Sequence, residues 1–195
     1  MPSGRTHDRI TLWTLPCIGG LSYLVTGRGE LASIVAGSFL FSGLMFGPDL
    51  DIYSVQYKRW GVFRWLWLPY RSLISHRSPL SHGLIIGTTL RLFYFLGFLS
   101  LIGILGVAIA QFFGGFHWNW QQVGQQIFQS LQRQYLAEAI ALFIGLELGA
   151  MSHAASDWLV SAYRSWRKSV VKKKRSPRKK YWYFIIVSSL LSIAF

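Results

Sequence analysis

The sequence predicts an all-α integral membrane protein, folded as a helical bundle with about four to five spans. Of its 195 residues, 52% are hydrophobic and only 14% are charged, whereas a soluble domain carries about a quarter charged residues. The charges are also unbalanced, since 20 Lys and Arg residues face 7 Asp and Glu residues, for a formal net charge of +13. Long apolar runs alternate with basic connections along the chain, which is typical of a membrane protein.

Five apolar runs are the candidate spans, and they cover residues 10–26, 31–47, 84–113, 135–151 and 181–195. The first two reach the lower limit for a bilayer span, about 17 residues. The second is rich in Gly, Ala and Ser, which favours close packing of helices in lipid. The third is the longest and contains a single charge, Arg91, so we interpret it as one tilted span. The fourth contains Glu138 and Glu147, and the fifth is short enough to lie along the membrane surface.

The basic residues predict the orientation of these spans. If all five runs cross the membrane, one side receives residues 1–9, 48–83 and 152–180, with two, five and ten Lys or Arg residues. The other side receives only Arg28 and Arg133. The positive-inside rule places the basic side in the cytoplasm.

This pattern divides the chain into a membrane-embedded domain over residues 1–163, a basic cytoplasmic segment over 164–180 and an apolar helix over 181–195. The basic segment is expected to contact anionic lipid headgroups. It has no interleaved aromatic residues and no recognisable nucleic-acid-binding module, so no nucleic-acid partner is expected. Nothing in the sequence specifies a protein partner.

Potential metal ligands gather on the predicted cytoplasmic side in four short clusters. Each cluster adjoins the end of a predicted span, and the pairs are His7 with Asp8, Asp49 with Asp51, His76 with His82, and His153 with Asp157. The remaining histidine, His117, falls on the opposite side among aromatic residues typical of a membrane interface, so we place it outside the site.

Local patterns suggest how these side chains converge. Ser78 followed by Pro79 predicts the start of a helix, with His76 in the approach loop and His82 one turn inside. Asp49 and Asp51, two apart on an extended chain, would point the same way. Taken alone, that pair fits a turn or helix cap better than a metal site.

In the last cluster, His153 and Asp157 share one helix face at i and i+4. Taken alone, this pair also fits a simple hydrogen bond.

Imidazole and carboxylate ligands without a thiolate favour zinc, with manganese or iron as alternatives. The single cysteine, Cys17, lies in an apolar run. The predicted metal ligands are His7, Asp49, Asp51, His76, His82, His153 and Asp157. They outnumber the ligands of one tetrahedral ion, so one or two divalent ions are expected.

The order of these motifs carries a family resemblance. An N-terminal His, then Pro-Asp-x-Asp over 48–51, His-Arg-x-x-x-x-His over 76–82 and His-x-x-x-Asp over 153–157 resembles the uncharacterised metal-binding membrane proteins of bacteria. It is also similar to the wider group of LexA-regulated membrane-bound metal-dependent hydrolases. Those relatives carry Thr-His-Ser where this chain has Ser81-His82-Gly83. A more distant likeness connects the pattern to the zinc-dependent phospholipase C and single-strand nuclease superfamily.

The resemblance implies a location in the bacterial inner membrane or another internal membrane, with the metal site facing the cytoplasm. It also implies a metal-dependent hydrolase that acts on a phosphoester or lipid-like substrate. In that mechanism Asp51 or Asp157 would accept the proton of the attacking water. Arg77 would bind the phosphate, with Arg71 as the second choice.

Two alternatives stay open. In the first, the protein binds a structural metal without catalysis, because a saturated ion can tie helix ends together. In the second it is a transporter, since Arg91, Glu138 and Glu147 are ionisable groups within predicted spans.

Overall fold

The computed structural model describes residues 4–76, 78–115 and 119–191, with backbone only for residue 5 and residues 169–191. Within these ranges the chain is helical and forms no strand. The helices are α1 (Gly4–Thr26), α2 (Gly29–Leu44), η1 (Pro48–Asp51), α3 (Val55–Arg59), η2 (Gly61–Trp67), α4 (Leu68–Leu73), α5 (Pro79–His82), α6 (Ile86–Gly114), α7 (Trp120–Arg133) and α8 (Leu136–Leu191). The chain separates into two compact units between Ser156 and Asp157. The first unit, Pro2–Ser156, contains the helix contacts and the side-chain clusters described below.

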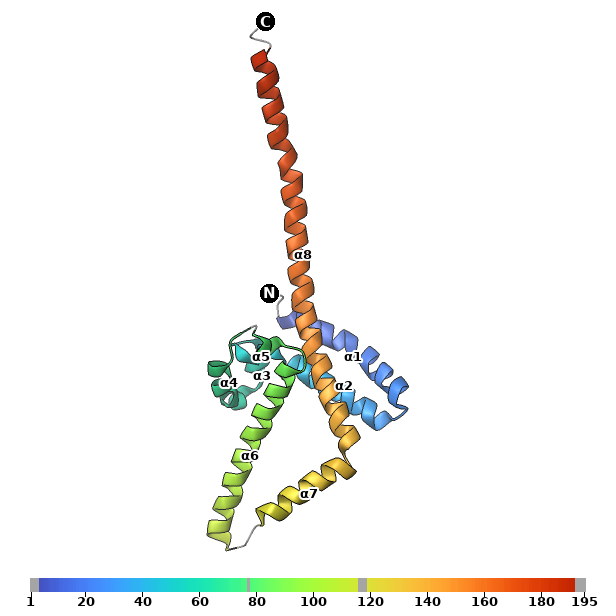
Figure 1. Ribbon diagram of the computed structural model, residues 1–195, viewed down its shortest axis with the longest axis vertical. Coiled ribbons are helices and arrows are strands. Elements are labelled where there is room, and N and C mark those ends of the chain that lie inside the picture. Colours follow the sequence, from blue (N-terminus) through green and yellow to red (C-terminus); the bar gives the residue numbers. More distant parts are fainter. Residues whose placement is uncertain (1–3, 77, 116–118, 192–195) are drawn as a thin grey trace. The chain divides into compact units, whose positions relative to one another are not determined.

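Helices α1 and α2 form an antiparallel hairpin (Figure 1). Gly27 ends α1 with a φ of +63°, a conformation that glycine adopts without the penalty of a side chain. The next helix begins at Gly29, so the turn is short. This hairpin places His7 of α1 near the end of α2, where the Pro-Asp-x-Asp motif begins.

Small residues bring α2 and α8 into backbone contact. Gly145 and Gly149 of α8 are four residues apart, and they face Ser38 and Ser42 of α2. A Cβ added at Gly149 would lie 2.6 Å from the Phe39 carbonyl oxygen. The Ser42 hydroxyl donates a hydrogen bond of 2.6 Å to the Leu146 carbonyl oxygen. This is the packing that small residues permit between helices in lipid.

The change Gly149→Leu is expected to disrupt this contact, because the new side chain would meet backbone atoms that cannot move aside. We expect a loss of about 3 kcal/mol in the free energy of unfolding, at the upper end for overpacking. Thermal unfolding in detergent measures it. The matched control is Gly103→Leu on α6, where a Cβ has no heavy atom within 4 Å. Equal unfolding temperatures for the two variants would contradict this assignment.

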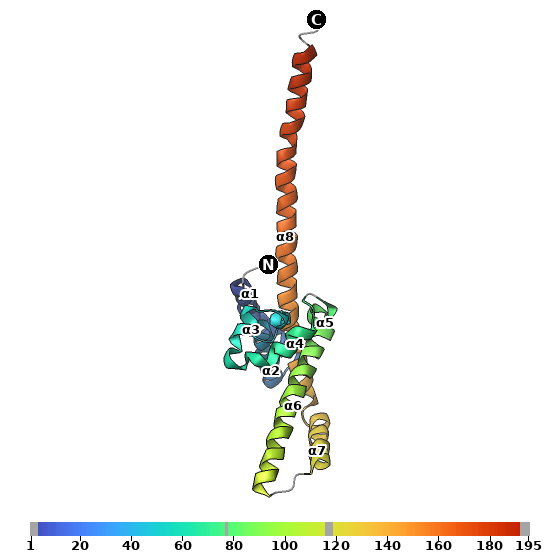
Figure 2. The same cartoon turned by 90° about the vertical axis from the view of Figure 1, so that its left-hand side faces the viewer.

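The connection between α2 and α6 is folded into short helices rather than extended. Figures 1 and 2 both show α3, α4 and α5 beside the N-terminal end of α6. An aromatic cluster supports them: the Trp67 ring is fully buried, stacks on Phe95 with 5.9 Å between ring centroids, and meets Phe46 edge-on at 5.5 Å. Leu50 and Tyr70 belong to the same core. The core therefore fixes η1, which carries both aspartates of the motif.

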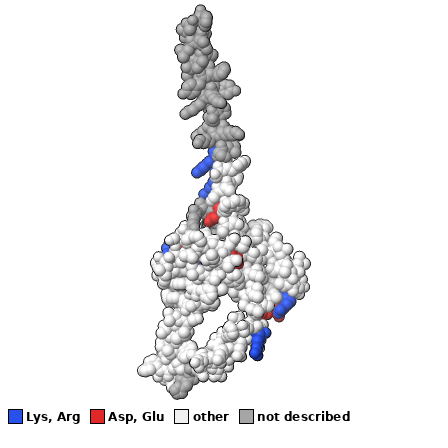
Figure 3. Space-filling model, viewed as in Figure 1, with Lys and Arg blue, Asp and Glu red and all other residues white. Residues whose placement is uncertain are grey.

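Three helical stretches in the described part of the chain are long and apolar enough to cross a membrane. They are Gly29–Asp51, Ile86–Gly114 and Leu136–Lys168. On the face drawn in Figure 3, the surface of α6 carries neither acidic nor basic side chains. The first predicted run, 10–26, is helical within α1 but is not among the three. The count of four to five spans stays a prediction.

Two elements differ from the sequence pattern. Helix α7 was not anticipated; its side chains are largely exposed, with glutamines on one face and Ile127, Phe128 and Leu131 on another. Helix α8 runs on through the predicted basic segment 164–180 to Leu191. The boundaries predicted at 163 and 180 stay a prediction, and residues 192–195 lie outside the described part.

Candidate metal centre

Asp49 lies at the centre of the histidine clusters. It belongs to the 3₁₀ helix η1, directly after α2. Its Oδ2 atom lies 3.3 Å from His153 Nε2, and its Oδ1 atom lies 3.9 Å from His82 Nε2. Ligand atoms of Asp49, His76 and His82 all lie within 4.8 Å of one another. Segments that are far apart in sequence thus bring their nitrogen and oxygen atoms to one small volume.

The second aspartate of the motif has a different position. The prediction of an extended chain was wrong at Asp49 and Asp51, because Pro48–Asp51 turns as a 3₁₀ helix and the two carboxylates diverge. Asp51 points at His76, whose Nδ1 atom lies 2.9 and 3.1 Å from its two carboxylate oxygens. The Asp51 side chain is 0% exposed. Asp51 therefore orients a histidine, whereas Asp49 faces the centre.

The hydrogen bond to Asp51 selects the tautomer of His76. A carboxylate can only accept, so His76 Nδ1 donates its proton, and in the neutral ring the lone pair stays on Nε2. That Nε2 atom is buried and has no hydrogen-bond partner among the described residues. A carboxylate behind a histidine is the arrangement that fixes ring orientation in metal sites.

Ser81 has the same effect on His82. Its Oγ atom lies 2.7 Å from His82 Nδ1, and it is also within 3.3 Å of the Ser78 carbonyl and 3.4 Å of the Ser75 carbonyl. Because the hydroxyl has one proton and directs it at a backbone carbonyl, it accepts from His82 Nδ1 and leaves the lone pair on Nε2. Burial lowers the pKa of His82, so its neutral, metal-ligating form is favoured.

His7 and His153 form the other part of the cluster. Their rings stack with 4.0 Å between centroids and 19° between planes. The Ser156 hydroxyl contacts His7 Nδ1 and donates a 2.8 Å hydrogen bond to the His153 carbonyl. By the same reasoning His7 Nδ1 donates to Ser156, and its lone pair lies on Nε2.

The donor atoms that meet at Asp49 are buried without hydrogen bonds. Across the described ranges, the buried side-chain atoms with no such partner include Asp49 Oδ1, His76 Nε2, His82 Nε2 and His153 Nε2. Leaving one buried polar atom unsatisfied costs about 1–3 kcal/mol. A divalent cation bound by Asp49, His76 and His82 would satisfy three of these atoms at once, and His153 Nε2 lies beside Asp49 Oδ2, so the donor set fits a metal.

Comparison with known families agrees with this geometry. Residues 2–167 match the family described as "Uncharacterized metal-binding protein (DUF2227)". The chain belongs to the DUF2227 family. Searches of curated proteins and of solved structures each found no match. The predicted resemblance to a metal-binding family is confirmed, while the relation to LexA-regulated hydrolases and the bacterial origin stay predictions.

Most of the predicted ligands of this DUF2227 protein come together. The structure gathers His7, Asp49, Asp51, His76, His82 and His153 in its first unit. Asp157 lies one helical turn after His153 on α8, as predicted. The predicted phosphate ligand Arg77 lies outside the described residues. The second choice, Arg71, lies over the Tyr57 ring at 4.5 Å from its centroid.

Asp8, next to the first ligand, has a supporting position. Arg59 Nη1 donates to Asp8 Oδ1 at 2.9 Å and to the Leu44 carbonyl at 2.8 Å, and its Nη2 atom donates to Asp8 Oδ2. The hydrogen bond to Asp8 raises the pKa of Arg59, so the guanidinium stays ionised. This pair ties the first turns of α1, which carry His7, to the end of α2.

Sequence reasoning missed Ser81 and Ser156. One directly precedes a predicted ligand, and the other follows His153 by three residues. A serine beside a histidine is too common a pattern to predict this role. Only the hydrogen-bond geometry identifies the two serines as residues that orient ligands.

Proposed function

We propose that this DUF2227 protein is a membrane-bound metalloprotein that hydrolyses a phosphoester of an amphiphilic substrate. The observation that carries the metal assignment is the set of buried side-chain atoms without hydrogen bonds that gather around Asp49, from Asp49, His76, His82 and His153. Zinc suits this mixture of imidazole and carboxylate ligands, and manganese or iron are the alternatives.

The hydrolase part rests on the chemistry that such a centre provides. A bound divalent ion lowers the pKa of water and polarises a phosphoryl oxygen. Asp49, His76, His82 and His153 would hold the ion, and Asp51 would keep His76 in its ligating tautomer. Since Asp51 is hydrogen-bonded to His76, we propose Asp157 as the base that accepts the proton of water. Asp157 follows His153 by one turn of α8, so the two side chains share a helix face.

The membrane supplies the argument for an amphiphilic substrate. The site lies at the end of one stretch that could span a membrane, Gly29–Asp51, and at the start of another, Ile86–Gly114. Between them, residues 52–75 contain four Lys or Arg residues and no acid. Exposed Phe63 and Trp65 accompany these charges. A basic segment with exposed aromatic rings suits the headgroup layer, where a lipid-like phosphoester would be found.

A structural metal is the second candidate, because three histidines and one carboxylate would complete a tetrahedral zinc site. Transport has less support, since the ionisable groups of the apolar helices have local partners. Glu138 pairs with Arg28 at 3.5 Å, and Glu147 accepts a 2.9 Å hydrogen bond from the Ile85 amide. Arg91 hydrogen-bonds to neighbouring residues.

The deciding experiment measures metal content and turnover on the same preparation. Purified protein is expected to contain a divalent metal by elemental analysis and to hydrolyse bis-p-nitrophenyl phosphate or a short-chain phospholipid. Turnover should disappear on chelation and return with added zinc. Retained metal without turnover of any phosphoester would favour the structural role, and absence of metal would remove both.

The proposed orientation places the centre on the cytoplasmic side with the basic segment 164–180. We expect a tag at residue 1 and a tag inserted after residue 168 to become accessible to a protease from the same side of sealed vesicles. The positive-inside rule is the physical reason. Accessibility from opposite sides would contradict the orientation.

A further inference from the structure

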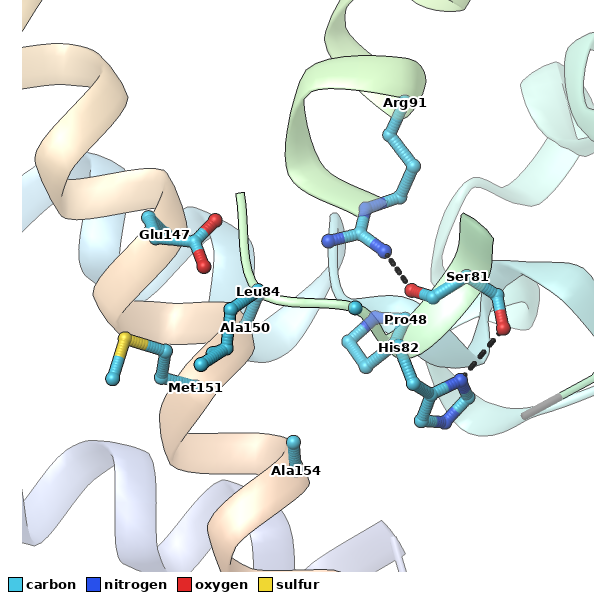
Figure 4. A pocket seen from close by; sticks show the side chains of 10 residues that line it. Pro48, Ser81, His82, Leu84, Arg91, Glu147, Ala150, Met151 and Ala154 are labelled. Atoms are coloured by element: carbon cyan, nitrogen blue, oxygen red, sulfur yellow. Dashed lines mark hydrogen bonds between the residues drawn. The ribbon is translucent and has the colours of Figure 1, made fainter. Parts of the chain in front are cut away.

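Arg91 is a buried charge beside the candidate metal centre. It lies in the second turn of α6, and only 1% of its surface is exposed. Its guanidinium donates through Nη1 to the Ser81 carbonyl at 2.8 Å and through Nη2 to the Thr88 hydroxyl at 3.0 Å. Figure 4 shows the guanidinium directed at the Ser81 carbonyl, with His82 on the other side of that residue.

Ser81 connects this arginine to a predicted metal ligand. Its carbonyl oxygen accepts from Arg91, whereas its hydroxyl accepts from His82 Nδ1 at 2.7 Å, and both contacts are drawn in Figure 4. The position of the Ser81 backbone therefore determines where the hydroxyl meets the imidazole. A shift of this backbone would turn His82 Nε2 away from Asp49.

Helix α5 cannot hold this position alone. It consists of the four residues Pro79–His82, a single turn, and isolated turns are not stable in the absence of tertiary contacts. The adjoining α6 backbone approaches the same carbonyl closely, since a Cβ at Gly87 would lie 2.7 Å from the Ser81 oxygen. The Arg91 guanidinium is the charged donor at this junction.

We propose that Arg91 is a positioning residue for the metal ligand His82. It holds the Ser81 carbonyl, which keeps the Ser81 hydroxyl against Nδ1 and presents Nε2 to the ion. This inference rests on the proposed metal site and adds a residue that touches neither the metal nor its ligands.

The burial of Arg91 separates this role from a contribution to stability. Burying a guanidinium is costly, and an apolar side chain of similar size often serves stability equally well. Its Nε atom has no hydrogen-bond partner in the described part of the chain. The variant Arg91→Met is therefore expected to fold, and its defect should appear in metal binding.

The first measurement is the affinity for zinc, by competition with a chelator, together with the visible spectrum of the cobalt-substituted protein. Arg91→Met should weaken binding about 10- to 100-fold, the range for residues that orient a ligand. Its cobalt spectrum should show a changed ligand set. Arg91→Lys keeps one donor for the Ser81 carbonyl and should recover most of the affinity. The matched control Thr88→Val removes the hydrogen bond that Arg91 donates to the Thr88 hydroxyl, and it should change affinity by less than about 3-fold.

The second measurement repeats Arg91→Met in a His82→Ala background. If Arg91 acts through His82, Arg91→Met should not lower the metal affinity of the His82→Ala variant any further, because both changes then remove the same ligand contact. An equal loss in both backgrounds would overturn the role. Wild-type affinity in Arg91→Met, or no recovery in Arg91→Lys, would also overturn it while leaving the metal site intact. A wild-type protein that binds no metal would instead remove the proposed function, and this role with it.

Discussion

Replacing His82 and His153 together with alanine is expected to strip the bound metal from the purified protein. The two imidazoles lie next to different oxygens of Asp49, His82 at 3.9 Å and His153 at 3.3 Å. Their loss leaves at most His76 and Asp49 of the central set. Loss of a residue that orients a ligand lowers metal affinity roughly 10- to 100-fold, and loss of a ligand itself should lower it further. The metal affinity of the double variant should therefore fall below about 10⁻⁴ of the wild-type value.

Elemental analysis of the double variant checks this directly, with zinc, manganese and iron measured in the same sample. The matched control is His117→Ala, a histidine that the sequence places away from the site. It should retain the full metal content. Unchanged metal in the double variant would remove the site hypothesis, whatever the activity of the protein.

Substituting the two aspartates of η1 should give unequal losses. Asp49→Asn removes the charge at the centre and turns an amide NH₂ group toward an imidazole Nε2, so we expect metal to be lost. Asp51→Asn leaves every proposed ligand in place. Its amide can donate to His76 Nδ1, which selects the tautomer with the proton on Nε2, and affinity should fall about 10- to 100-fold.

Zinc competition titrations distinguish the two variants, and Glu30→Gln is the control because that carboxylate lies on the exposed start of α2. Equal losses at Asp49 and Asp51 would show that both aspartates ligate, as the sequence alone predicted. Metal binding at the original affinity in Asp49→Asn would exclude the central position assigned to it.

Hydropathy predicted the parts of the fold that local sequence controls. The runs 31–47 and 84–113 correspond to α2 and α6, and the Ser78-Pro79 step begins a helix as expected. The connection over 48–83 could not be predicted in the same way. Its short helices are held by contacts that are distant in sequence, such as Trp67 against Phe95.

The site was predicted by residue type but not by role. Scarce histidines and acids at the ends of predicted spans pointed to the residues that the structure brings together, because few other residues in this basic, apolar chain can bind a cation. Their roles depended on local geometry: a 3₁₀ turn separates Asp49 from Asp51, and serine hydroxyls behind His82 and His7 select the tautomers. Neither feature has a sequence period or motif to signal it.

The orientation of three of the imidazoles has a thermodynamic consequence. His7, His76 and His82 each direct Nδ1 at an oxygen acceptor. An arriving cation therefore meets rings that are preorganised, so little side-chain entropy is lost on uptake. Titration calorimetry of the apoprotein should accordingly show a small entropic penalty, and the rate of loading should depend on how fast the ion sheds its hydration water.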